Sequence, residues 1–186
     1  MAAAASSPAV PPAGRQPSGP YRICLVCLGN ICRSPMAEIL LRTELARAGL
    51  SAAVEVDSAG TGDWHIGEPM FGPALAELSR RGFDGSGHRA RQFQRSWLAR
   101  YDLVLAMDRS NLADLRRMGP EEAAAGRVRL LRSFDPGLVA GDAYHDEVPD
   151  PYGGGPDGFE LAFDLIRDAA RGLADQLASF LEVRAP

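Results

Sequence analysis

The stretch over residues 26–35 (VCLGNICRSP) constrains the fold more than any other part of this chain. It follows an apolar, β-prone run over residues 21–26 and precedes a segment with apolar residues at helical spacing. Ser34 is a good helix N-cap, and Pro35 suits the first helical position. The stretch is therefore predicted to be a short loop that joins a first buried strand to a helix N-terminus.

Segments typical of strands and of helices alternate along the rest of the chain. Further buried strands are predicted over residues 54–57, 101–107 and 128–131, and helices over residues 37–48, 73–81, 94–100, 108 or 110 to 118, and 156–182. This alternation indicates an α/β fold with a parallel sheet. In such sheets ligands bind beyond the carboxyl ends of the strands. The loop after the first strand lies at such an end, as do the loops that carry Trp64 and Asp150.

Length and composition favour one globular domain that is not specialised for nucleic acid. The chain has 186 residues, 46% of them hydrophobic and 24% charged, and its formal net charge is −4. A chain of this length can bury a full core, and the negative charge does not suggest a nucleic-acid-binding protein. All 20 basic residues are Arg. The lack of Lys excludes a Walker-type phosphate loop, which needs one.

Residues 1–19 are predicted to be a disordered tail before a single domain over residues 20–186. The tail is rich in Ala, Pro and Ser and has neither the basic start nor the apolar stretch of a signal peptide. No apolar run approaches the roughly 18 residues of a membrane span. The 3 cysteines cluster near one strand–loop junction, which is typical of a reducing compartment. We expect a cytoplasmic protein that does not associate with membranes, and the sequence leaves export by a non-classical route open.

Cys27 and Arg33 stand at opposite ends of the predicted loop, where backbone amides and a helix N-terminus favour an anion. The same dipoles stabilise a thiolate, and a thiolate can attack a phosphate ester to form a phosphocysteine that water then opens. Gly29 lets the backbone fold tightly, and the planar fork of Arg33 can hold two phosphate oxygens. The Ser34 hydroxyl can hydrogen-bond the sulfur. These residues predict a hydrolase of phosphate esters.

The spacing of Cys27 and Arg33 is a weak signal by itself, because the chain has 3 Cys and 20 basic residues that are all Arg. The alternative is a buried Cys and a surface Arg. The order strand, Cys, Gly-Asn, Arg-Ser-Pro, helix is far more specific, and the motifs that follow it strengthen the signal.

The stretch resembles the signature of the low-molecular-weight protein-tyrosine phosphatases. The similarity continues through DSAGTGDW (57–64), HRARQF (88–93), YDLVLAMDRSN (101–111), LLRSFDP (130–136) and VPDPYGG (148–154). It implies a four-stranded parallel sheet flanked by helices on both sides, with the phosphate-binding loop after the first strand. It also implies hydrolysis of phosphotyrosine in proteins, and the arginine-only, alanine-rich composition suggests a bacterial, actinobacterial type.

The resemblance assigns roles that the residues alone leave open. It makes Asp150, in a Asp-Pro-Tyr segment, the general acid and base beside the nucleophile Cys27 and the phosphate clamp Arg33. From the residues alone Asp142, Asp146 and Glu147 are equally eligible. The implied substrate-binding residues are Leu28, Gly29, Asn30, Ile31, Cys32, Ser34, Trp64 and Tyr152, of which Trp64 and Tyr152 would flank the substrate ring. Ser58 and His88 would support the loop together with Asn30, and Asp108 would have a minor supporting role.

Other residues near the predicted site receive weaker interpretations. Cys32 is either a small apolar filler or a redox partner that forms a reversible disulfide with Cys27. Gly153 stands where many relatives carry a second Tyr, which implies a wider pocket on that side. His65 and His145 are given no role. The 3 histidines show no ligand spacing, so neither a metal nor another cofactor is predicted.

Three other functions are less consistent with the sequence than phosphotyrosine hydrolysis. Thioredoxin-coupled arsenate reductases share this fold and loop but need distal cysteines, and no Cys follows Cys32. Protein-arginine phosphatases resemble this chain but carry Thr where Ile31 stands. A phosphate-binding module without catalysis would be expected to lack Cys27, Arg33 or Asp150. The expected partners are therefore phosphotyrosine-containing proteins, bound by a chain that is mostly a monomer and at most a weak dimer.

Overall fold

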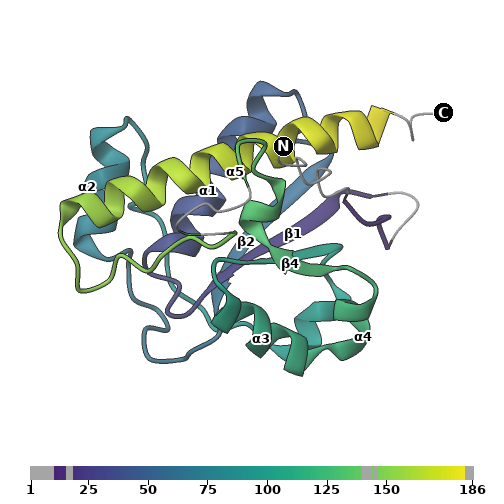
Figure 1. The fold of residues 1–186 in the computed structure, drawn as a ribbon, viewed down its shortest axis with the longest axis horizontal. Helices are drawn as coiled ribbons and strands as arrows, with labels where there is room; N and C mark the ends of the chain where they lie inside the picture. Colours follow the sequence, from purple (N-terminus) through teal and green to yellow (C-terminus); the bar gives the residue numbers. More distant parts are fainter. Residues whose placement is uncertain (1–10, 16–18, 140–143, 145, 183–186) are drawn as a thin grey trace, which may run out of the picture.

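A four-stranded parallel sheet forms the centre of the computed structural model, which describes residues 11–15, 19–139, 144 and 146–182 (Figure 1). The strands are β1 (Tyr21–Cys27), β2 (Val54–Gly60), β3 (Leu103–Ala106) and β4 (Val128–Leu130), in the order β2-β1-β3-β4. The chain leaves β1 in one direction to form β2 and returns to form β3 on the other side of β1. The loops after β1 and β3 therefore diverge at a switch point, where such sheets bind ligands.

Helices cover both faces of the sheet (Figure 1). One core lies between the sheet and α1 (Arg33–Arg47), α2 (Gly72–Arg80) and α5 (Pro156–Glu182). The other lies under α3 (Arg109–Met118), α4 (Pro120–Ala124) and the 3₁₀ helix η1 (Arg95–Ala99). Alternate residues of β1 feed the two cores, because successive side chains of a strand point to opposite faces. Ile23, Leu25 and Cys27 enter the first, and Cys24 and Val26 enter the second.

The predicted fold class is confirmed, with differences at element ends. β2 continues to Gly60, three residues beyond the predicted strand. Residues 95–99 form a 3₁₀ helix instead of the predicted α-helix, and a second 3₁₀ helix, η2 (Leu131–Phe134), was not predicted. α4 was not predicted either, because Gly119 followed by Pro120 is a sequence typical of a helix end. Pro120 instead opens a new helix, since its fixed φ and missing N–H suit the first helical turn.

Part of the predicted tail packs against the amino ends of the strands. The Arg15 side chain donates from Nε to the carbonyl of Tyr101 at 3.0 Å, and the Tyr21 hydroxyl donates to the carbonyl of Pro12 at 3.0 Å. Residues 1–10 and 16–18, which make up most of that tail, lie outside the described residues. None of the helices described here is both long and apolar enough to cross a membrane.

Gly172 lets α5 lie directly on η2. A Cβ at this position would lie 2.1 Å from the carbonyl oxygen of Phe134, which is backbone and cannot move aside cheaply. We expect Gly172→Ala to destabilise the protein by about 1–3 kcal/mol, although alanine favours a helix interior by about 1 kcal/mol. Urea unfolding of the purified variant measures this.

Gly158→Ala is the matched control, because a Cβ there would meet Pro151 at 3.6 Å, an ordinary contact distance. This variant should be at least as stable as the wild type. Equal stability of Gly172→Ala and the wild type would contradict the close packing of α5 on η2.

Candidate active site

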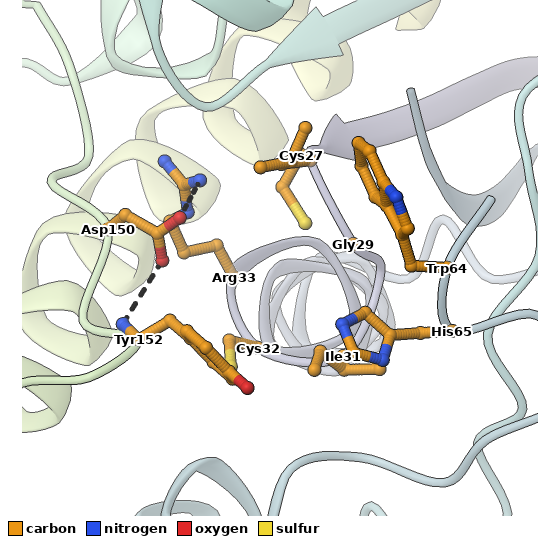
Figure 2. A pocket seen from close by; sticks show the side chains of 10 residues that line it. Cys27, Gly29, Ile31, Cys32, Arg33, Trp64, His65, Asp150 and Tyr152 are labelled. Carbon is orange, nitrogen blue, oxygen red and sulfur yellow. Dashed lines mark hydrogen bonds and ion pairs between the residues drawn. The ribbon is translucent and has the colours of Figure 1, made fainter. Parts of the chain in front are cut away.

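The loop between β1 and α1 surrounds the sulfur of Cys27 with hydrogen-bonding groups. Cys27 is the last residue of β1, and its Sγ accepts from the backbone N–H of Asn30 at 3.3 Å. The Ser34 hydroxyl lies 3.1 Å from the same sulfur. In Figure 2 the sulfur points into a pocket between Arg33 and Trp64. Donors in these positions stabilise a thiolate, which is the nucleophilic form of cysteine.

Ser34 serves the sulfur and does not cap the helix, so its prediction as N-cap is wrong. The N-cap of α1 is Cys32, which offers no side-chain acceptor, and Ser34 lies one residue inside the helix. The first N–H groups of α1 therefore remain available to an anion. The Ser34 hydroxyl also lies 3.1 Å from the carbonyl of Ala59, so its one proton has two acceptors, that carbonyl and the sulfur.

Asn30 holds the loop in a conformation that other residues disfavour. Its φ of 54° is the only positive value at a non-glycine residue in the described part of the chain. Its fully buried side chain donates to the hydroxyls of Ser34 at 2.8 Å and Ser58 at 3.0 Å, and accepts from the backbone N–H of Arg91 at 2.9 Å. These bonds tie the loop to β2 and to the segment after α2.

His88 supports Asn30 from the backbone side. Its Nε2 lies 2.7 Å from the carbonyl oxygen of Asn30. Burial lowers the pKa of His88 below its usual value, although the bond to Asn30 opposes this shift. The ring is therefore neutral near pH 7, and the Nε2–H tautomer donates to the carbonyl. The predicted group of Asn30, Ser58 and His88 is thus joined around one residue, together with the backbone of Arg91, which had not been predicted.

Arg33 is a buried cation held by two carboxylates. Its side chain is 2% exposed, and its Nη1 donates to Asp108 Oδ2 at 2.6 Å and to the carbonyl of Val148 at 3.1 Å. Its Nη2 donates to Asp150 Oδ2 at 2.7 Å (Figure 2). Burial alone would lower the pKa of Arg33, but the negative charges of Cys27, Asp150 and Asp108 raise it above its usual value. The guanidinium stays charged and faces the sulfur.

Asp150 is the carboxylate that the fold brings to this pocket among the candidates it describes. Its segment is fastened to the end of β3, because the backbone N–H of Val148 donates to the carbonyl of Met107 at 2.8 Å. Asp146 instead pairs with Arg109 Nη2 at 2.6 Å, and Glu147 accepts from the Arg109 backbone N–H. Asp142 lies outside the described residues, as does His145. Tertiary structure therefore separates acids that the sequence left equivalent.

The pocket has a volume of about 120 Å³ and apolar walls. Trp64 and Tyr152 are 68% and 56% exposed and line it from the loops after β2 and β4. Tyr152 also packs on Phe71, with ring centroids 5.0 Å apart. The remaining lining residues are Cys27, Leu28, Gly29, Ile31, Cys32, Arg33, His65 and Asp150. The predicted residues Asn30 and Ser34 lie beneath this surface, fully buried. A flat ring fits between exposed aromatic walls.

Two residues that line the pocket, His65 and Cys32, differ in what the sequence predicted for them. His65 lines the pocket although it was given no role, and its position directly after Trp64 in a Gly-rich loop was the available signal. Cys32 lines the pocket as predicted, and burial, followed by the negative charges of Cys27 and Asp150, raises its pKa to about 12. Its thiol is therefore protonated, and Cys27, Cys32 and Cys24 are all free cysteines.

A metal site is not formed by the part of the chain that is described. No group of three or more His, Cys, Asp or Glu side chains there is placed to hold a metal ion. The charged groups of the pocket, Arg33 and Asp150, are instead paired with each other.

Comparisons with known proteins agree with this geometry. A family model described as low molecular weight phosphotyrosine protein phosphatase matches residues 22–182. A low molecular weight protein-tyrosine-phosphatase of Streptomyces coelicolor is 50% identical over 165 residues, covering 89% of this chain and 98% of that protein. Low molecular weight protein-tyrosine phosphatase A of Mycobacterium tuberculosis is 44% identical over 158 residues, covering 85% and 92%. The crystal structure of YfkJ from Bacillus subtilis is similar with a TM-score of 0.76 and 35% identity, covering 92% and 100%.

The side chain of Asn30 can be tested separately from its backbone conformation. Asn30→Ala removes three buried hydrogen bonds and takes the partner from the Ser58 hydroxyl and from the Arg91 N–H, so we expect a loss of about 2–4 kcal/mol in the free energy of unfolding. Asn30→Gly loses the same bonds but accepts a positive φ without strain. It should therefore be more stable than Asn30→Ala by about 1 kcal/mol. Denaturant unfolding of both variants measures this, and equal stability would show that the backbone relaxes when the side chain is lost.

Proposed function

The chain belongs to the low-molecular-weight phosphotyrosine protein phosphatase family, and on that premise we propose that it hydrolyses phosphotyrosine in proteins through a phosphocysteine on Cys27. The observation that carries the proposal is the sulfur of Cys27 at the floor of a loop that presents backbone amides and a buried guanidinium to one small pocket. Such a loop binds a phosphate dianion and places its phosphorus against the nucleophile.

In the first step the thiolate attacks phosphorus, an S–P bond forms, and the bond between phosphorus and the tyrosine oxygen breaks. Arg33 holds the equatorial oxygens, whose negative charge the amides share. In the structure Arg33 Nη2 binds Asp150 at 2.7 Å, so a phosphate oxygen that takes this donor releases the carboxyl group. The released Asp150 carboxylate takes up a proton from solvent and, as general acid, gives it to the departing tyrosine oxygen.

In the second step water attacks the phosphocysteine and the S–P bond breaks. Asp150, now a carboxylate, accepts the proton of that water as general base. The leaving thiolate is stabilised by the Ser34 hydroxyl, which lies 3.1 Å from the sulfur and can turn its proton toward it. Inorganic phosphate leaves, and Asp150 releases the accepted proton to solvent when it pairs with Arg33 again.

The walls of the pocket support an aromatic substrate. Trp64 and Tyr152 offer exposed rings, and Ile31 adds an apolar surface that is 6% exposed. Apolar walls accept the ring of phosphotyrosine more readily than the charged guanidinium of phosphoarginine. Arsenate reduction coupled to thioredoxin would need cysteines beyond Cys32, and the chain has none.

The setting of the enzyme belongs to the same proposal. We place the catalytic domain over residues 20–186, with residues 1–19 as a tail, in a cytoplasmic enzyme that acts mainly as a monomer on phosphotyrosine-containing proteins. It needs no cofactor, because thiolate, guanidinium and carboxyl group supply nucleophile, clamp and acid. Cys32 lies in the same loop as Cys27, which supports a reversible disulfide that protects the nucleophile from further oxidation.

Replacement of the nucleophile tests the covalent step. We expect Cys27→Ser to lower kcat for p-nitrophenyl phosphate by at least about 10³-fold, because a hydroxyl in this loop has no base to activate it. Cys24→Ala is the matched control, since that fully buried thiol lies in the core on the other face of the sheet. It should retain the activity, and appreciable turnover by Cys27→Ser would contradict the nucleophile assignment.

Replacement of the acid tests proton transfer. We expect Asp150→Asn to lower kcat for phosphotyrosine by roughly 10²–10⁴-fold, and by less for p-nitrophenyl phosphate, whose leaving group departs without a proton. Inorganic phosphate should inhibit this variant at least as strongly as the wild type, because Arg33 loses a competing charge. Asp146→Asn, which alters an acid paired with Arg109, should retain wild-type kcat. Equal losses for both substrates would argue against the acid role.

A further inference from the structure

His65 lines the pocket, but it takes no part in the two catalytic steps. Its ring covers the loop at Gly29, where an added Cβ would lie 2.9 Å from His65 Cδ2. The same ring neighbours Tyr152, with centroids 6.4 Å apart and planes at 51°. In Figure 2 it projects into the pocket beside the loop, with Trp64 on one side and Tyr152 on the other. His65 is thus placed between the phosphate loop and the aromatic walls.

Glu68 holds this ring in one orientation. Its Oε2 lies 2.7 Å from His65 Nδ1, and its backbone N–H donates to the His65 carbonyl at 2.9 Å. The turn is fastened to Ala90 by two backbone bonds of 2.8 Å, from Gly67 N–H to the Ala90 carbonyl and from Ala90 N–H to the Glu68 carbonyl. Because a carboxylate only accepts, Nδ1 carries the proton, and in the neutral ring Nε2 is an acceptor.

The second ring nitrogen of His65, Nε2, is available to a ligand. His65 Nε2 has no hydrogen-bond partner in the described part of the chain, and the side chain is 28% exposed at the pocket. In the neutral ring this nitrogen is an acceptor of fixed orientation at a partly exposed position, which suits contact with a ligand. In the proposed function the phosphate binds at the loop floor and the tyrosine ring between the walls, which would bring the substrate's main chain to the rim that His65 forms with Trp64 and Tyr152.

We propose that His65 is a specificity-determining residue whose Nε2 accepts a hydrogen bond from a main-chain N–H of the substrate beside the phosphotyrosine, with Glu68 as its positioning residue. This inference rests on the proposed function. Its consequence is that the enzyme distinguishes a phosphotyrosine within a peptide from a small aryl phosphate that ends at the ring. Because this hydrogen bond comes from the main chain of the substrate, it does not depend on which side chains flank the phosphotyrosine.

The experiment compares p-nitrophenyl phosphate with a five-residue phosphotyrosyl peptide of otherwise alanine. We expect His65→Ala to lower the ratio of kcat/KM for the peptide to that for p-nitrophenyl phosphate by about three- to tenfold, mainly through KM, which is the worth of one hydrogen bond. Glu68→Ala, which leaves the ring in place but untethered, should lower the same ratio by a smaller factor. Glu121→Gln, a change of an exposed acid on α4, is the control and should leave the ratio unchanged.

A second set of peptides identifies the bond itself. Methylation of one backbone nitrogen at a time, at the phosphotyrosine or at the residue after it, removes one donor. One of these methylations should cost the wild type the same factor that His65→Ala costs, and should cost His65→Ala nothing further. An unchanged ratio in His65→Ala, or equal losses on methylation in both enzymes, would overturn the proposal. Failure of the proposed function would look different, because neither substrate would then show turnover that depends on Cys27.

Discussion

The buried amide of Asn30 is the interaction on which the rest of the site depends. A loop that turns its N–H groups inward around an anion needs a residue in the left-handed region, and this chain uses Asn where Gly would be easier. The strain is offset by bonds to Ser34, Ser58 and the Arg91 backbone, which belong to α1, β2 and the segment after α2. The shape of the loop is therefore set by three separate parts of the fold, and the sulfur of Cys27 is held where those parts meet.

The positive charge of Arg33 is paired with carboxylates before any substrate arrives. Arg33 is buried, and a buried cation without partners would be costly. Asp108 binds Nη1 and also caps α3 by accepting from the Asn111 N–H at 2.7 Å, and its side chain is 22% exposed. Asp150 binds Nη2 with a side chain that is 41% exposed. The two carboxylates thus differ in how easily they can leave. A phosphate dianion can replace Asp150 at Nη2, so the guanidinium keeps an anionic partner there, and the replaced group is the acid that the reaction needs.

Much of the fold was predictable, because β1 and β3 are short, mostly apolar runs and α5 has a regular apolar period. The predictions of local structure were wrong where one residue type can have two structural roles. Pro120 can follow one helix or open another, and it opens α4. Ser34 can cap a helix or hydrogen-bond a nearby sulfur. The structure places the N-cap of α1 two residues earlier, at Cys32. For His65 the sequence offered only its position directly after Trp64, since its other neighbours in the pocket, Gly29 and Tyr152, are far from it in the sequence.

By itself the sequence determined the α/β class, the loop between Cys27 and Arg33, and the kind of chemistry, because these depend on local periodicity and on residues a few positions apart. The resemblance to the family named Asp150, Trp64 and Tyr152, but only the tertiary structure shows how Asp150 reaches the pocket and that His65 lines it as well. Asp150 is 123 positions from Cys27 along the chain, and it reaches the loop because Val148 is bonded to the end of β3, next to β1 in the sheet. Strand order is set by packing on both sheet faces, and that is a property of the whole chain.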